Sequence, residues 1–171
     1  MEHFNQEDFQ NWPSRYRANF FNSLGGFKSI NLLASADELG NLNLAPFFSV
    51  QHIGANPPLL SLVFRPETVE RHSLDNFRKL GKATLNAVHK DIVLPAHQTS
   101  AKYPKGVSEF EAVGLHPLKH DFPIPFVKEA NLYMGIEWVS EHKIQINNTI
   151  LVIASIKEVH INNKDAILDD G

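Results

Sequence analysis

Short apolar runs, separated by glycine, proline and asparagine, limit the folds that this sequence can adopt. Runs that alternate in polarity, or are apolar throughout, predict β-strands, and the turn residues between them predict tight connections. Six runs qualify: 27–36, 42–50, 59–64, 83–89, 134–146 and 149–161. Few helical segments intervene, so the chain lacks the regular strand–helix alternation of parallel sheets. The pattern predicts a mainly β fold, an antiparallel barrel with short helices at its rim.

Three further segments carry helix signals at their ends. Residues 13–26 begin with proline and end with two glycines, which predicts a short helix, with a strand over 17–22 as the alternative. A helix over 73–81 has serine as its N-cap and glycine at its end. Ser108 and Glu111 have the spacing of a capping box, which predicts another short helix.

Length, charge and cysteine content restrict the classes of function. A chain of 171 residues, 43% of them hydrophobic, suits a single domain over 1–171. A net charge of -3 argues against a general electrostatic grip on nucleic acid or anionic membrane. No cysteine is present, which excludes disulfides and fits a reducing cytosol. Because no run approaches the ~18 apolar residues of a membrane span, we expect a cytoplasmic protein.

Motifs for side-chain catalysis or metal binding are missing from the sequence. The nine histidines include no HExxH or HxH spacing, and His116 and His120 have no evident third ligand beyond Asp121. GxSxG, GxGxxG and GxxxxGK[ST] are all absent. We therefore expect no metal and no catalytic side chain.

The segment around residues 65–77 has the chemistry of a phosphate site. Arg65 closes a strand, and Arg71 and His72 stand just before the helix that Ser73 is expected to cap. A helix N-terminus offers free N–H groups and a positive dipole end, to which an arginine and a hydroxyl add donors. The ordinary alternative is a plain serine cap with solvated arginines.

The predicted strand 42–50 has an unusually small and polar edge. Asn43, Ala45 and Ser49 share one parity, interrupted by Phe47. Such an edge would let a flat ligand approach the backbone, although a strand facing a small helix or water gives the same pattern. The run "PPLLSLVFRP" connects this strand directly to the phosphate segment. A planar ring at the first and a phosphate at the second describe flavin mononucleotide (FMN).

The order of these motifs resembles the flavin reductase-like, FMN-binding split-barrel family. The resemblance is best over 27–87, through "DELG", "NLAPFFS", "PPLL" and "RHSLDN", and continues more loosely through "KYPKGVSEFEAVGL" and "NTILVIASIKEVHI". It implies a split β-barrel, antiparallel and Greek-key, that binds FMN, with FAD less expected. It also implies that the strand at 42–50 lines the ring and ribityl chain through its backbone, and that the later segment holds the phosphate. The implied cofactor-binding residues are Asn43, Leu44, Ala45, Pro46, Ser49, Val50, Arg65, Arg71, His72, Ser73 and Asn76.

The resemblance further implies an oxidoreductase in which the flavin carries the chemistry. Hydride would come from NAD(P)H, and electrons would pass to free flavin, a monooxygenase partner or another acceptor. Two departures stand out: His72 replaces an acidic residue, and "NNT" at 147–149 replaces the "GDH" often linked to nicotinamide handling. The alternatives are a non-catalytic FMN-binding electron carrier or flavin store, and a barrel module without flavin. A homodimer is also implied, with the strand 149–161 as an interface element or as barrel core.

Overall fold

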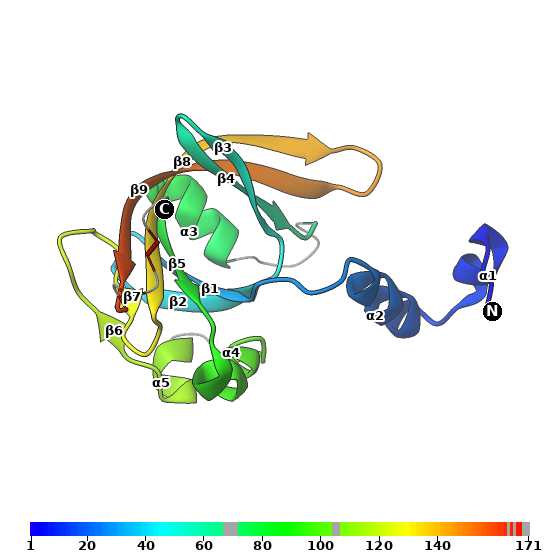
Figure 1. Cartoon of the computed structure of the whole chain (residues 1–171), viewed down its shortest axis with the longest axis horizontal. Helices are drawn as coiled ribbons and strands as arrows, with labels where there is room; N and C mark the ends of the chain where they lie inside the picture. Colours follow the sequence, from blue (N-terminus) through cyan, green and yellow to red (C-terminus); the bar gives the residue numbers. More distant parts are fainter. Residues whose placement is uncertain (67–71, 104–106, 164, 166, 169–171) are drawn as a thin grey trace.

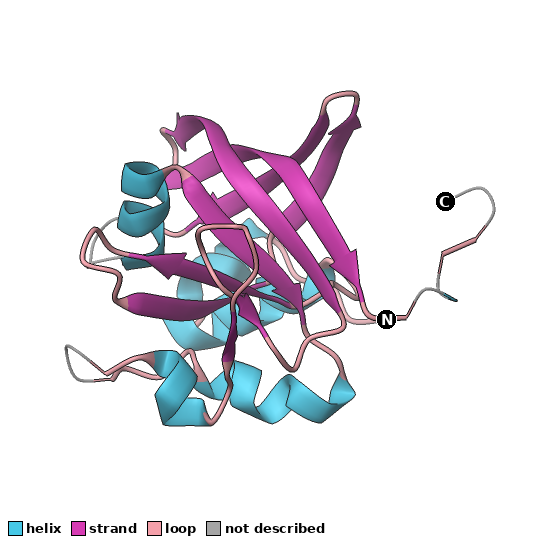
Figure 2. Cartoon of the chain, turned by 90° about the vertical axis from the view of Figure 1, so that its left-hand side faces the viewer, coloured by secondary structure: helices cyan, strands magenta, loops and turns pink. Residues whose placement is uncertain are grey.

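The fold is built on one sheet of seven strands that closes into a barrel with an open seam. The computed structural model describes residues 1–66, 72–103, 107–163, 165 and 167–168. The strands run in the order β2-β1-β5-β8-β9-β4-β3, and every described pair is antiparallel (Figures 1 and 2). Their bounds are β1 Asn31–Ala36, β2 Leu42–Phe47, β3 Val50–Ala55, β4 Pro58–Phe64, β5 Lys82–Ala87, β8 Leu132–Ile144 and β9 Thr149–Ile161. The predicted antiparallel barrel is therefore confirmed.

The predicted strand over 42–50 is wrong in one respect, because the structure divides it in two. Residues 42–47 form β2 at one edge of the sheet, whereas β3 begins at Val50 and forms the opposite edge. Between them the chain crosses the open seam at Phe48 and Ser49. Pro46 has no N–H to offer a ladder, and its place on an edge strand agrees with that chemistry.

Helix α3, His72–Leu80, plugs one end of the barrel (Figure 1). Its Leu74 and Phe77 are fully buried among side chains from the strands, including Leu62 and Val152. The Phe77 ring also meets the Trp138 ring edge to face, with centroids 5.1 Å apart. The helix ends where predicted, since Gly81 adopts a φ of 67° and its N–H donates to the carbonyl of Phe77.

A second buried layer covers the outside of β1 and β2. It is formed by the 3-10 turn Lys90–Ile92, α4 Val93–Gln98, α5 Glu109–Val113 and the small hairpin of β6 Pro117–Leu118 and β7 Phe126–Val127. Leu32, Leu44 and Phe110 are among its buried side chains. With a core on each side, all six residues of β1 are buried. Neither α4 nor the hairpin is among the elements expected from the sequence, and the three prolines of residues 116–126 agree with a loop instead.

The remaining sequence expectations differ from the structure mainly at element ends. The strand expected from residue 27 begins at Asn31. Helix α3 begins at His72, so Ser73 lies inside its first turn and is not the N-cap. The capping box is also wrong: Ser108 makes no capping bond to α5, and its buried Oγ has no partner among the described residues. Helix α5 is instead held by Glu109, whose Oε2 accepts from the N–H of Leu44 at 3.0 Å.

Two helices precede the barrel and extend away from it (Figure 1). They are α1 Gln6–Asn11 and α2 Ser14–Leu24, and the latter confirms a helix over the strand alternative for 17–22. Neither helix contains a buried residue. In the part of the chain that the structure describes, no helix has the length and apolar character needed to cross a membrane.

Candidate functional site

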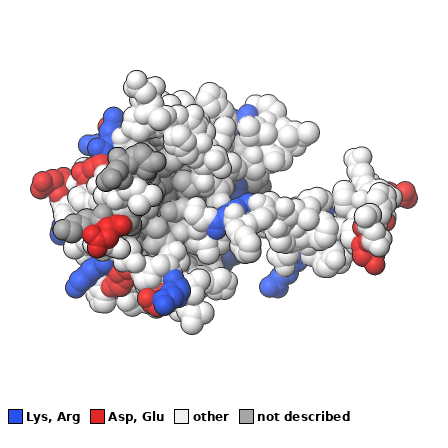
Figure 3. Space-filling model, in the orientation of Figure 1, with Lys and Arg blue, Asp and Glu red and all other residues white. Residues whose placement is uncertain are grey.

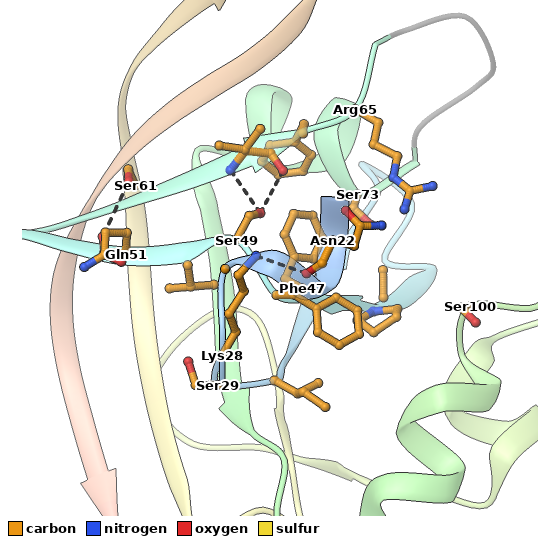
Figure 4. Close-up of a pocket in the computed structure, with 18 of the residues that line it drawn as sticks. Asn22, Lys28, Ser29, Phe47, Ser49, Gln51, Ser61, Arg65, Ser73 and Ser100 are labelled. Atoms are coloured by element: carbon orange, nitrogen blue, oxygen red, sulfur yellow. Dashed lines mark hydrogen bonds between the residues drawn. The ribbon is translucent and has the colours of Figure 1, made fainter. Parts of the chain in front are cut away.

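A cleft of about 1320 Å³ lies where the seam of the barrel meets the base of α2 (Figure 4). One wall comes from the crossing between β2 and β3 and from the neighbouring part of β4. The other comes from the last turn of α2 and the segment 25–30. Ser73, at the start of α3, and Thr99 and Ser100, just after α4, complete the lining. The cleft therefore collects residues from five separate parts of the chain.

Charge in the cleft has one sign. Lys28 and Arg65 are the only charged side chains among the described residues that line it. Ser73 adds a hydroxyl within the first turn of α3, whose N-terminal end has a positive dipole. The chain as a whole carries a net charge of -3, so the cleft is a local reversal of the overall balance. Such a site attracts an anion.

Two amide–hydroxyl contacts attach α3 to the edge strand β2 and to its neighbour β1. Asn43 Nδ2 donates to Ser73 Oγ at 2.8 Å, and Asn76 Nδ2 donates to Ser35 Oγ at 3.4 Å. Because the Ser73 oxygen accepts from Asn43, the hydroxyl proton of Ser73 is free to point elsewhere, and this residue lines the cleft. Asn43 therefore faces α3. This contact explains one polar residue of the edge formed by Asn43, Ala45 and Ser49 without any ligand.

A two-way contact continues the β3–β4 pairing into the crossing and fixes it to β4. Ser49 Oγ donates to the carbonyl of Val63 at 2.9 Å and accepts from the N–H of the same residue at 3.2 Å. A single side chain thereby occupies both backbone groups at this position of β4. The crossing is held close to β4, and the phenyl rings of Phe47 and Phe48 remain on the lining of the cleft.

The structure brings six of the eleven predicted cofactor-binding residues to the cleft. These are Ala45, Pro46, Ser49, Val50, Arg65 and Ser73. Four others lie outside its lining. Asn43 contacts Ser73 of α3, and Asn76, within α3, contacts Ser35 of β1. Leu44 is fully buried in the core, and His72 is exposed at the start of α3. Arg71 lies outside the described residues. The segment "NNT" at 147–149 lies at the turn between β8 and β9, away from the cleft lining.

Sequence reasoning missed the half of the cleft that comes from the N-terminal side. Asn19, Asn22 and Lys28 belong to it, and Figure 4 shows Asn22 and Lys28 beside Phe47 and Ser49. Lys28 Nζ also donates to the carbonyl of Asn22 at 3.5 Å. The sequence signal for Lys28 was "GGFK", which puts a cation directly after the end of a helix. The position of Lys28 opposite the seam, however, depends on tertiary structure. No group of three metal-ligating side chains occurs among the described residues.

The class of the protein follows from the comparisons: the sequence model of the flavin reductase like domain matches residues 24–169. The chain belongs to this family. The predicted family and the split-barrel fold are thereby confirmed.

Solved structures show the same arrangement. A split-barrel protein from Shewanella frigidimarina, named as a flavin reductase, is 44% identical with a TM-score of 0.94, covering 100% of this chain and 85% of that one. Nitrilotriacetate monooxygenase component B from Bacillus cereus is 21% identical with a TM-score of 0.84, covering 99% and 85%. Flavoredoxin of Desulfovibrio vulgaris is 17% identical with a TM-score of 0.69, covering 84% and 74%. At 0.94 over the whole chain, the agreement with the Shewanella protein includes the N-terminal helices.

Proposed function

We propose that the cleft binds FMN and that the protein is an NAD(P)H-dependent flavin reductase-like oxidoreductase. The observation that carries this proposal is the lining of the cleft: its charged side chains are Lys28 and Arg65, and Ser73 adds a donor at the start of α3. A phosphate monoester carries a charge of about -1.5 to -2 at pH 7, which two cations and a helix N-terminus can balance. FAD fits this chemistry less simply, because its two phosphates form a pyrophosphate bridge to an adenosine and leave no terminal phosphate monoester.

The lining also fits the planar part of a flavin. Phe47 and Phe48 supply aromatic surface, and Ala45 leaves room for a ring to approach the strand. Backbone N–H and C=O groups of the edge strand are suited to the polar rim of the ring. The phosphate and ring subsites belong to one continuous cleft, as one FMN molecule requires.

FMN, when bound, supplies the redox chemistry by accepting hydride from a reduced nicotinamide and delivering electrons to an acceptor. The protein would orient the ring and place donors near its polar edge. Arg65, Ser73 and Lys28, which line the cleft, would hold the phosphate. We propose that the acceptor is free flavin, a monooxygenase partner or another redox protein. We further propose a homodimer that works in the cytoplasm, for which the cysteine-free sequence is suited.

A paired titration tests the phosphate assignment. FMN and riboflavin, which lacks the phosphate, are titrated against the wild type, Arg65→Ala, Lys28→Ala and the exposed control Lys119→Ala. Loss of one charge-assisted contact costs about 1.5–3 kcal/mol, so FMN affinity should fall roughly 10- to 100-fold, while riboflavin affinity stays close to that of the wild type. Equal losses for both flavins in the cleft variants would overturn the assignment.

A separate measurement tests the use of nicotinamide. The flavin-loaded protein is mixed with NADH or NADPH without air, and the flavin absorption is followed. Bleaching with either donor supports the reductase. A persistent yellow colour with both donors contradicts it and favours the electron carrier, which the missing "GDH" at 147–149 would also suit.

A further inference from the structure

Four polar side chains form a reciprocal clamp between α3 and the two strands beside it. On the sheet, Ser35 of β1 and Asn43 of β2 are direct cross-strand partners, so their side chains point to the same face. On α3, Ser73 and Asn76 are three residues apart and also share a face. The sheet and the helix therefore each present one hydroxyl and one amide to the other.

The two contacts of the clamp run in opposite directions and lie in different surroundings. The inner contact, from Asn76 Nδ2 to Ser35 Oγ at 3.4 Å, is in the core, where Ser35 is fully buried and Asn76 is 8% exposed. The outer contact, from Asn43 Nδ2 to Ser73 Oγ at 2.8 Å, ends at a residue that lines the cleft. The inner contact anchors α3, and the outer contact reaches the wall of the proposed site.

The outer contact decides how the Ser73 hydroxyl is oriented. A serine hydroxyl has one donor and two acceptor positions, and it rotates to suit its neighbours. Because the Asn43 N–H can only donate, the Ser73 oxygen accepts and its own proton points away from Asn43. Among the described residues, no acceptor for this proton lies within hydrogen-bond distance. The proton is therefore left for a ligand in the cleft.

The cations of the cleft have the same hydrogen-bonding character. Arg65 and Lys28 line the cleft, and their side chains contain donors without acceptors. Figure 4 shows Arg65 and Ser73 on the same side of the cleft. With the Ser73 hydroxyl oriented as a donor, all three side chains present protons. Such a set matches a ligand group that has only acceptors, as a dianionic phosphate monoester does.

We propose that Asn43 is a positioning residue that acts through Ser73 and makes the cleft selective for a phosphate monoester. This inference rests on the proposed function. Asn43 lies outside the lining of the cleft, so it acts without touching the ligand. It holds the Ser73 hydroxyl in the donating orientation before the ligand arrives, and a donor that is already oriented does not have to be ordered on binding. Riboflavin, which lacks the phosphate, gains nothing from this orientation.

A double-mutant cycle tests the inference. FMN and riboflavin are titrated against the wild type, Asn43→Ala, Ser73→Ala and the double variant, and the phosphate preference is the ratio of the two dissociation constants. We expect the preference to fall about tenfold in Ser73→Ala and about fivefold in Asn43→Ala. The double variant should lose no more than Ser73→Ala alone, because Asn43 acts only through the hydroxyl. Riboflavin affinity should stay within about twofold of the wild type in all of them.

The inner contact provides a matched control. Ser35→Ala breaks the same kind of bond to the same helix and leaves the Asn76 amide without its partner, so the midpoint of urea unfolding should fall. Neither residue lines the cleft, and the phosphate preference should remain that of the wild type. If Asn43→Ala does not fold, Asn43→Leu, which also lacks the donor and is closer to asparagine in size, takes its place with the same expected loss.

The outcomes separate this inference from the proposed function. The inference is overturned, with the FMN site intact, if Asn43→Ala keeps the phosphate preference that Ser73→Ala loses. It is also overturned if Asn43→Ala lowers the preference equally in the presence and absence of the Ser73 hydroxyl, or if Ser35→Ala lowers it as much. A wild type that binds FMN no more tightly than riboflavin would overturn the phosphate site itself, and the role of Asn43 with it.

Discussion

The barrel and the N-terminal arm, residues 1–24 with α1 and α2, bury their aromatic side chains to opposite extents. In the barrel, Phe77 of α3 is fully buried and the strands around it supply a continuous core. In the arm, six aromatic rings contact one another, yet no residue of α1 or α2 is buried. The difference shows that apolar content alone does not make a region self-sufficient. The barrel folds around its own core, whereas the rings of the arm contact one another without being covered.

The largest expected effect separates these regions directly. Phe77→Ala removes a buried ring that packs against Trp138, and we expect it to lower the free energy of unfolding by about 3–5 kcal/mol. Phe21→Ala, the matched change in the arm, should alter barrel unfolding by less than about 0.5 kcal/mol in dilute solution. Urea titrations of both variants measure this. Similar losses would mean that the arm is part of the barrel core.

The next prediction compares the two walls of the cleft. Ala45→Phe inserts a ring where the flavin is proposed to lie, and we expect FMN affinity to fall about 30-fold or more, equivalent to about 2 kcal/mol. Asn22→Ala, on the arm side, should reduce it less than tenfold. Fluorescence titration with FMN gives both values. If folded Ala45→Phe binds FMN normally, the edge of β2 does not face the flavin.

Polar contacts in the barrel should contribute to the stability of the barrel, whereas polar contacts within the arm should not. Glu109→Gln weakens the carboxylate contact to the N–H of Leu44, and we expect a loss of about 1–2 kcal/mol of barrel stability. The exposed Glu111→Gln on the same helix is its control. Arg17→Ala breaks a contact within the arm and should leave the unfolding of the barrel unchanged. If Arg17→Ala lowered the free energy of barrel unfolding and Glu109→Gln left it unchanged, this account of the two regions would be contradicted.

The smallest effect concerns pH. Burial raises the pKa of Glu129, but hydrogen bonds from the side chain and N–H of His116 outweigh it and leave this pKa below its ordinary value. A lowered pKa in the folded state stabilises the protein above the unfolded pKa, and this contribution is lost as the pH falls through the folded pKa. Between pH 6 and pH 3 the wild type should therefore lose up to about 1 kcal/mol more than Glu129→Gln. Parallel urea titrations at the two pH values would contradict this if both proteins lost the same amount.

The sequence predicted the strands better than the way they meet. The alternation in β8, the apolar run of β9 and the glycine end of α3 are local signals, and the structure confirms them. The division of 42–50 depends on which edge each half joins, and periodicity has no information on that point. Arg65 and Ser73 were found because they closely follow the predicted strand 59–64 in the sequence. Lys28 was missed because its place in the cleft depends on how segment 25–30 packs against the seam.

The central claim is that the cationic cleft at the barrel seam holds FMN. The most direct measurement is the absorption spectrum of the purified protein, before and after addition of FMN, with chromatographic identification of any flavin released on unfolding. The account predicts a flavin spectrum, present at once or after reconstitution, and release of FMN in a ratio near one per chain. A colourless protein that also takes up no added FMN would contradict it.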